Sequence, residues 1–161
     1  MARNLRPFPF PINIGTDICQ ISRIYTILNS PRRTRFVNRI LAPEEVSRHD
    51  ERLNPKVLTD GDVRCLTHGD VKASPLWKTA AFMAGFAAKE AAIKAHSNRR
   101  LTFHDVIIER RGGRRETLGS GPPVARIRGG EGGDVSALVS ISHDGDYATA
   151  VCVAHDESVQ C

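Results

Sequence analysis

Two carboxylates in the sequence stand where carboxylates are uncommon. Asp17 interrupts an alternating run of β-branched residues, a setting in which aspartate is depleted. Glu90 belongs to an alanine-rich segment, four residues after Phe86 and three before Ile93, near the apolar stripe of a predicted helix. If the strand packs on this helix, the two carboxylates meet. Proteins usually hold magnesium with such a pair, completed by water and phosphate oxygens, so the pattern indicates a candidate metal site.

Lys94 follows Glu90 by one helical turn and would face the same site, where its charge could stabilise a phosphate group. An alternative interpretation needs no ligand at all. Glu90 and Lys94 would then form an ordinary ion pair on the helix surface, and Asp17 would cap the helix that follows it. The residue pattern alone leaves both interpretations open.

Other catalytic signatures are missing from the sequence. It contains no Walker A loop, no Gly-x-Gly-x-x-Gly after a strand, no His-Glu-x-x-His and no Gly-x-Ser-x-Gly. The run Ser142-His143-Asp144 cannot form a hydrolase triad, because neighbouring residues of a strand point to opposite faces. The four cysteines lie far apart with no Cys-x-x-Cys pair, which disfavours a disulfide scaffold or a zinc ribbon and fits a reducing intracellular compartment.

The elements that must position these residues follow from hydrophobic periodicity. A strand is predicted over residues 12–18, with Ile12, Ile14, Thr16 and Ile18 on its buried face and Asp17 on the other. The longest predicted helix covers residues 76–95 and begins beside Pro75. The remaining predicted elements are helices over residues 18–28 and 33–41, a turn of helix starting at 43–45, strands over 103–109 and 124–127, and a hairpin of 137–142 with 147–154.

With 161 residues the chain is long enough for a single domain. Residues 1–11, which hold three prolines, are expected to form a flexible N-terminal segment, and residues 49–74 a loop insertion. The longest uncharged apolar run, residues 80–88, is nine residues long, whereas a membrane-spanning helix needs about 20. No membrane partner is therefore expected.

The net charge of +5 calls for an acidic partner, without distinguishing nucleic acid, a membrane surface, an acidic protein or a phosphorylated small molecule. Arginines gather in two places, either of which could also be plain solvated surface. One cluster consists of Arg32, Arg33, Arg35 and Arg39, and the other of Arg110, Arg111, Arg114 and Arg115.

Four sequence motifs resemble those of a known family in order and rough spacing. They are Asn13-Ile14-Gly15-Thr16-Asp17-Ile18, Phe36-Val37-Asn38-Arg39-Ile40-Leu41, Phe86-Ala87-Ala88-Lys89-Glu90-Ala91-Ala92-Ile93-Lys94-Ala95 and Val139-Ser140-Ile141-Ser142-His143. The family is that of the holo-(acyl-carrier-protein) synthases, the small bacterial-type 4′-phosphopantetheinyl transferases. The resemblance covers residues 12–154, and the helix motif is its most specific part. The extra loop at 49–74 and the sequence Gly-Thr-Asp-Ile-Cys resemble those of the fungal mitochondrial branch of the family.

The resemblance implies an α+β fold in which a small antiparallel sheet packs on a long central helix. It also implies transfer of 4′-phosphopantetheine from coenzyme A to a serine of apo acyl carrier protein, with release of adenosine 3′,5′-bisphosphate. Asp17 and Glu90 match the family's Mg²⁺ ligands, and Lys94 matches a lysine that contacts phosphate. Ser142 and His143 match positions near the adenosine phosphates of coenzyme A. The base is then either Glu90 or a metal-bound water.

Carrier proteins are acidic around their serine, which gives the first arginine cluster a partner. In the resembling enzymes the carrier docks where this chain has Arg23, Arg32, Arg35 and Phe36. The same enzymes are homotrimers with active sites between subunits, so a homotrimer is expected. A mitochondrial location is expected from the branch, with a cytoplasmic one as the alternative.

Two positions depart from the family pattern. Gly85 stands where many relatives have arginine, and Gln20 replaces a frequent glutamate, and either change could weaken pyrophosphate or metal binding. An inactive relative that still binds a carrier is therefore one alternative. A basic nucleic-acid-binding domain is another, disfavoured because aromatic residues make up only 6% of the chain and no strand shows the aromatic pairs that stack on bases.

Overall fold

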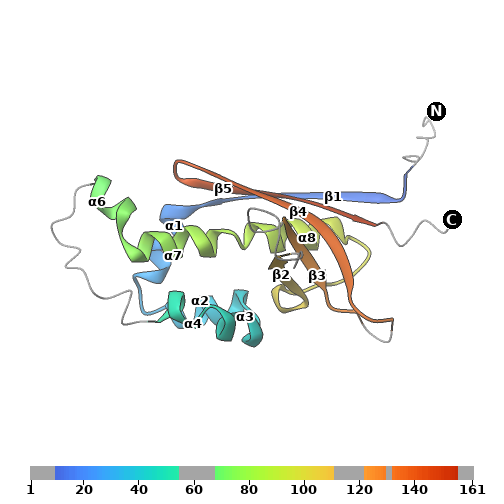
Figure 1. Ribbon diagram of the computed structural model, residues 1–161, viewed down its shortest axis with the longest axis horizontal. Helices are drawn as coiled ribbons and strands as arrows, with labels where there is room; N and C mark the ends of the chain where they lie inside the picture. The colour runs from blue at the N-terminus through green and yellow to red at the C-terminus, as the bar shows by residue number, and fades with distance from the viewer. Residues whose placement is uncertain (1–9, 55–67, 111–121, 130–131, 156–161) are drawn as a thin grey trace, which may run out of the picture.

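The computed structural model describes residues 10–54, 68–110, 122–129 and 132–155 (Figure 1). Its centre is a five-stranded antiparallel sheet with the strand order β1-β5-β4-β3-β2. In chain order the strands are β1 (Ile12–Gln20), β2 (Val106–Arg110), β3 (Pro123–Ile127), β4 (Val135–Asp144) and β5 (Tyr147–His155). The expected α+β class with a small antiparallel sheet is confirmed, as are the strand at 124–127 and the C-terminal hairpin.

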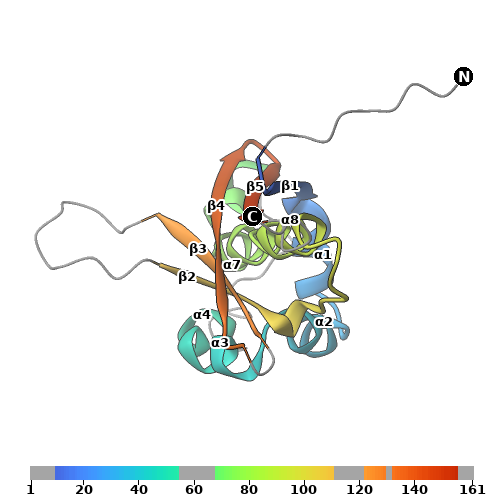
Figure 2. The same cartoon turned by 90° about the vertical axis from the view of Figure 1, so that its right-hand side faces the viewer.

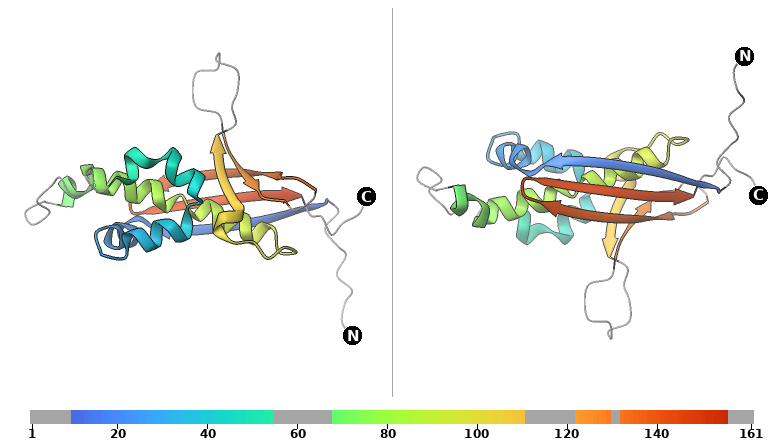
Figure 3. Two further views of the ribbon diagram at one scale, coloured as in Figure 1. Left: turned by 90° about the horizontal axis from the view of Figure 1, so that it is seen from below. Right: turned by 90° about the horizontal axis from the view of Figure 1, so that it is seen from above.

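The helices lie on one side of the sheet, as Figure 2 and the right-hand view of Figure 3 show. They are α1 (Ile21–Leu28), α2 (Arg33–Ile40), α3 (Pro43–Arg48), α4 (Asp50–Leu53), α6 (His68–Ala73), α7 (Pro75–Ala84) and α8 (Ala87–Ala95), with the 3₁₀ turn η2 at Phe103–Asp105. α8 packs against β1 and β5, and α1 packs against α7. Among the described residues, no helix is both long and apolar enough to cross a membrane.

The single long helix predicted over residues 76–95 is wrong, because the chain breaks into α7 and α8 at Gly85 and Phe86. Around the break, hydrogen bonds reach back three residues, from the Gly85 amide to the Phe82 carbonyl and from the Phe86 amide to the Met83 carbonyl. Glycine is a poor helix former, and the tighter bonding allows the chain to change from one helix to the next. The two helices follow one another below the sheet (Figure 1).

The predicted buried face of β1 is also wrong. Ile14 and Ile18 are 62% and 66% exposed, whereas Gly15 and Cys19 are buried against the helices. A methyl group added at Gly15 would lie only 1.9 Å from the Ala91 carbonyl oxygen of α8. Glycine at this position therefore permits a strand-to-helix distance that a side chain would prevent, and the small residues of β1 face the helix.

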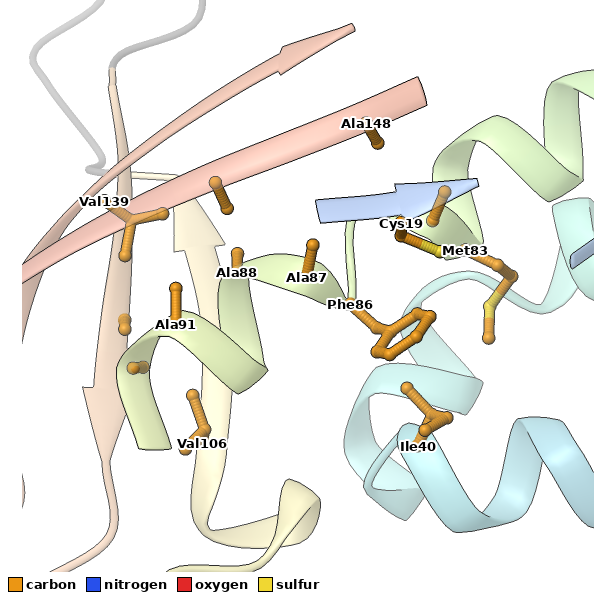
Figure 4. Close-up of a cluster of buried hydrophobic side chains, with 14 of the residues drawn as sticks. Cys19, Ile40, Met83, Phe86, Ala87, Ala88, Ala91, Val106, Val139 and Ala148 are labelled. Atoms are coloured by element: carbon orange, nitrogen blue, oxygen red, sulfur yellow. The ribbon is translucent and has the colours of Figure 1, made fainter. Parts of the chain in front are cut away.

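The core beneath the sheet is built largely from small side chains, as the close-up in Figure 4 shows. Ala87, Ala88 and Ala91 of α8 are fully buried, and so are most of the alanines that β4 and β5 direct toward it. Larger side chains fill the end of the core near the helix break, where Phe86 makes edge contacts with Phe36 and Phe103. Small residues let α8 pack close to the sheet, so polar side chains of α8 and β1 can contact one another at their junction.

A buried ion pair fixes α8 to the helices below it. Lys89 is 2% exposed and donates hydrogen bonds to the Glu45 carboxylate and to the carbonyl oxygens of Ile40 and Phe103. Burial lowers the pKa of Lys89, and the neighbouring Glu45 opposes that shift. With three acceptors its ammonium group is fully paired, which is the condition under which a buried charge is tolerated.

The predicted loop at residues 49–74 contains helix where the structure describes it, because α4 and α6 lie at its two ends. Residues 55–67 lie outside the described part of the chain. Of the predicted flexible segment 1–11, only residues 10 and 11 are described.

Candidate active site

Asp17 and Lys94 meet at the junction between β1 and α8. Lys94 Nζ lies 2.8 Å from Asp17 Oδ1 and 2.9 Å from the Thr16 carbonyl oxygen. The Asp17 side chain is only 12% exposed, whereas that of Lys94 is 55% exposed. Asp17 is directed toward the helix because it shares the face of β1 that holds Gly15 and Cys19. The predicted meeting of strand and helix is therefore confirmed.

Glu90 lies in the same cluster, one turn before Lys94 on α8. Its pKa is raised, first by partial burial and then by repulsion from Asp17 and a hydrogen bond with it, while Lys94 and Arg23 oppose the shift. The pKa of Lys94 is raised by its hydrogen bond to Asp17. Two carboxylates that repel one another beside a half-exposed lysine form a site whose charge favours a bound cation.

The residues of this cluster fit a magnesium ion. Asp17 and Glu90 provide carboxylate oxygens, the ligands that a hard divalent cation prefers, and magnesium usually takes only one or two of them from the protein. Across the described ranges, no group of three or more His, Cys, Asp and Glu residues could hold a metal. The donor set therefore suits an ion that completes its shell with water and substrate oxygens, and it does not suit a structural zinc site.

Cys19 is close to the carboxylates but is not a reactive nucleophile. Burial raises its pKa to about 11, and the nearby carboxylates add to the shift. At neutral pH the thiol is protonated, and only the thiolate attacks electrophiles.

A separate cavity of about 990 Å³ lies between the helices α3, α4 and α7 and the strands β2, β3 and β4. Gly85 and His143 line it, and apolar side chains cover much of its wall. Its charged lining is Arg48, Arg52 and Lys89 with Glu45 and Glu109, so the cations outnumber the carboxylates by one. The Arg52 guanidinium lies 5.3 Å from the centre of the Phe82 ring, and Arg48 makes a long ion pair of 3.7 Å with Glu109. Asp17, Glu90 and Lys94 do not line this cavity, so a single chain presents the carboxylates and the basic cavity as separate surfaces.

The two residues expected near the adenosine phosphates point to opposite faces of β4. His143 pairs in register with the buried Ala148 and lines the cavity on the helix side. Ser142 pairs with the exposed Thr149 on the outer face. Within one chain they therefore cannot contact the same group, for the reason that also excluded the Ser142-His143-Asp144 triad.

The residues expected at the carrier surface lie on and around α1 and α2. Arg23, Arg32 and Arg35 are exposed, while Phe36 is half-buried against Phe86, with ring centres 6.1 Å apart. Phe36 thus belongs partly to the core. Of the second arginine cluster, Arg111, Arg114 and Arg115 lie outside the described residues.

Sequence reasoning missed Arg48 and Arg52. Arg52 falls in the segment predicted as a loop, and neither residue belongs to an arginine cluster. Only the packing of α3 and α4 beside α7 brings them to the cavity that Gly85 lines, so no local signal could have identified them.

Comparisons with known proteins agree with this architecture. A family model described as the 4′-phosphopantetheinyl transferase superfamily matches residues 13–152. A relative from Aspergillus fumigatus, 4′-phosphopantetheinyl transferase B, mitochondrial, is 35% identical over 93% of this chain and 97% of its own length. A holo-(acyl-carrier-protein) synthase from Myxococcus xanthus is 30% identical over 87% of this chain and 91% of its own.

Among solved structures, the holo-ACP-synthase from Plasmodium yoelii is similar, with a TM-score of 0.56 and 26% identity. The match covers 88% of this chain and 91% of that one. The family model spans most of the chain and includes β1, α8 and β4, the three elements that carry the candidate site. The chain therefore belongs to the 4′-phosphopantetheinyl transferase superfamily and is an enzyme of the holo-(acyl-carrier-protein) synthase type.

Proposed function

We propose that the chain transfers 4′-phosphopantetheine from coenzyme A to a serine of an apo acyl carrier protein, in a magnesium-dependent reaction that releases adenosine 3′,5′-bisphosphate. The product would be an active carrier for fatty-acid synthesis or a related carrier-based synthesis. The observation that supports this best is the meeting of Asp17, Glu90 and Lys94 where β1 packs on α8. It joins two carboxylates suited to magnesium with a cation suited to phosphate.

Asp17 and Glu90 would hold the magnesium ion. When bound, the ion supplies positive charge that neutralises the pyrophosphate of coenzyme A and aligns it with the attacking hydroxyl. The carrier serine attacks the phosphorus that bears the pantetheine, and the bond to the adenosine-side phosphate breaks. Little covalent chemistry falls to the protein in such a transfer, so positioning and charge account for most of the acceleration.

Two side chains of α8 act on the reacting groups in this proposal. Glu90 would accept the proton of the serine hydroxyl, because its carboxylate lies on α8 one turn from Lys94, beside the place where the pyrophosphate would bind. Lys94 stabilises negative charge on the phosphate that is transferred or released, and its half-exposed ammonium group can reach a substrate.

The nucleotide end of coenzyme A would bind in the basic cavity. His143, Arg48 and Arg52 offer donors for phosphate oxygens, and the apolar wall offers a surface for the adenine ring. Gly85, which stands where many relatives have arginine, also lines this cavity. Arg48 and Arg52 would supply the positive charge that Gly85 lacks. Ser142, on the other face of β4, would contact coenzyme A bound at a neighbouring subunit.

The carrier protein would dock on the surface around α1 and α2. Arg23, Arg32 and Arg35 are exposed there and would attract the acidic side chains around the carrier serine. The exposed part of Phe36 would add an apolar contact beside the arginines.

We further propose that the enzyme is a homotrimer with active sites between subunits. The outer face of β1, β5 and β4 supports this, because no described helix covers it (Figure 3). Ile14, Ile18 and Leu138 on this face are 62%, 66% and 59% exposed, and exposed apolar side chains gathered on one face commonly mark an interface. Within one chain the cavity and the carboxylates are apart. In the trimer, the cavity of one subunit would lie beside the carboxylates of its neighbour.

A mitochondrial location is proposed because the Aspergillus fumigatus relative is named as mitochondrial and is similar over nearly its whole length.

The experiment is intact-protein mass spectrometry of an apo acyl carrier protein incubated with this enzyme, coenzyme A and magnesium. The expected result is a gain of one phosphopantetheine mass, which disappears when coenzyme A or magnesium is left out. No gain with several carriers would contradict the proposal and favour an inactive relative. Replacing Gly85 with arginine is a demanding rescue, because an added Cβ would lie 2.9 Å from the Phe82 carbonyl oxygen.

A further inference from the structure

Lys94 holds one of the oxygens that a metal ion at this site would need. Its Nζ contacts Asp17 Oδ1 at 2.8 Å and the Thr16 carbonyl oxygen at 2.9 Å. A divalent cation bound to the same carboxylate would lie only a few ångströms from this ammonium group, so repulsion between the two positive charges opposes binding of the ion while Lys94 stays in place. Lys94 and the cation therefore compete for the negative charge of Asp17.

Lys94 is also free to move, in contrast to the other lysine of the same helix. Lys89 is 2% exposed and pairs with three acceptors in the interior, whereas the Lys94 side chain is 55% exposed. Its long aliphatic chain can carry the ammonium group away from Asp17 with little change in packing. A phosphate group bound nearby would offer it a second anionic partner.

We propose that Lys94 competes with the divalent cation for Asp17, so that metal and pyrophosphate bind cooperatively. Without the pyrophosphate, Lys94 neutralises Asp17 and keeps the affinity for the metal low. When coenzyme A binds, Lys94 transfers to a phosphate oxygen, and the charge of the Asp17 carboxylate becomes available to the ion. Because coupling between two ligands is reciprocal, the metal raises the affinity for coenzyme A by the same factor.

This proposal rests on the proposed function, since it takes Asp17 and Glu90 as the metal ligands and coenzyme A as the substrate. It adds that Lys94 is responsible for the coupling between the two ligands. Coupling factors between ligand sites are commonly about 5- to 150-fold, and an effect of that size is measurable by direct binding.

The experiment measures Mn²⁺ binding by the electron paramagnetic resonance signal of the free ion, with and without coenzyme A and with no carrier protein. Manganese is a suitable probe because it accepts the same carboxylate and water ligands as magnesium. The variants are Lys94→Met, which removes the charge, and Lys94→Arg, which keeps it. Lys78→Met is the matched control, because Lys78 is an exposed lysine of α7 that does not line the cavity.

The wild-type protein and Lys78→Met are expected to bind Mn²⁺ weakly alone and at least about 5-fold more tightly with coenzyme A. Lys94→Met is expected to bind Mn²⁺ alone at least about 5-fold more tightly than the wild type, with most of the coenzyme A effect lost. Lys94→Arg should behave more like the wild type. Mn²⁺ binding to Lys94→Met alone that is no tighter than wild type would overturn the competition.

The failure of the proposed function gives a different result. If Asp17→Asn does not weaken Mn²⁺ binding, the metal site itself is misplaced and both proposals are overturned. If Asp17→Asn weakens Mn²⁺ binding but coenzyme A changes that binding in no variant, the metal site stands and only the coupling is overturned. If Asp17→Asn abolishes binding and coenzyme A tightens it in wild type and Lys94→Met alike, only the role of Lys94 is overturned.

Discussion

Asp17, Glu90 and Lys94 show how far single residues can be interpreted from a sequence. Their meeting was predictable, because an aspartate in a β-branched strand and a glutamate beside an apolar helix stripe are both unusual. The face of β1 was not predictable from alternation, since both sets of residues in the strand could be buried. The deciding feature is the close approach of Gly15 to Ala91, which depends on tertiary packing.

The charge of Glu90 should destabilise the protein at neutral pH. Its pKa is raised above the ordinary value of 4.5, so the folded protein favours the protonated form and stability falls as pH rises through the raised pKa. In metal-free buffer Glu90→Gln should therefore raise Tm at pH 7, by an amount on the order of 2 °C, and by less at pH 5. Thermal unfolding followed by circular dichroism checks this. A Tm gain that is larger at pH 5 than at pH 7 would mean that the charged form of Glu90 stabilises the fold, which would contradict the prediction.

The exposed arginines around α2 should act on the carrier and not on coenzyme A. Arg35→Glu reverses a charge at an exposed position of α2, so the KM for apo carrier should rise about tenfold while the KM for coenzyme A stays unchanged. Steady-state kinetics with each substrate varied in turn provide the measurement. Arg100→Glu, at another exposed arginine, is the control. Equal losses for both substrates in Arg35→Glu would reject this division of roles.

At the scale of elements, the sequence predicted most strands and helices but not their breaks and contacts. The alanine-rich segment was correctly assigned as helix, yet its division at Gly85 arises from local hydrogen bonding that periodicity does not report. The residue that caps the start of α1 could not be predicted from periodicity either. Asp146, in the turn between β4 and β5, accepts hydrogen bonds from the backbone and the hydroxyl of Ser22, which is distant in sequence.

The contact between β1 and α8 should depend on Gly15. Gly15→Ala would place a methyl group 1.9 Å from the Ala91 carbonyl oxygen, so strand and helix must separate. The free energy of unfolding should fall by about 1–3 kcal/mol, as measured by urea denaturation. Gly132→Ala is the matched control, because a Cβ there meets no atom within 4 Å. Unfolding curves for Gly15→Ala that superimpose on the wild type would contradict the close packing described here.

At the scale of the molecule, one chain separates two surfaces that the proposed reaction would use together. The carboxylates lie where β1 meets α8, and the basic cavity opens elsewhere between the helices and the sheet. In the proposed trimer, the outer face of the sheet would bring two copies together. Sequence alternation correctly grouped these isoleucines on one face but wrongly predicted that the single chain buries it, and the proposed trimer would bury this face against other subunits.

Disrupting that face should disrupt assembly. Ile14→Glu places a charge at a position that is 62% exposed in the single chain, so the subunit should still fold. Light scattering after size-exclusion chromatography should show a trimer for the wild type and monomers for Ile14→Glu, with transfer activity lost. Ser97→Glu, at an exposed position beyond α8, should remain trimeric. An active monomer would show that the site needs no second copy.

The most direct test of the whole account is the magnesium dependence of phosphopantetheine transfer in Asp17→Asn and Glu90→Gln. Both substitutions keep the shape of the side chain and remove its charge, and Glu51→Gln, at an exposed position of α4, is the control. Intact-mass measurement of the carrier across a magnesium titration should show at least about 100-fold slower transfer in both site variants, with wild-type rates in Glu51→Gln. Transfer that keeps its rate and its magnesium dependence in both variants would contradict the assignment of these carboxylates to the metal.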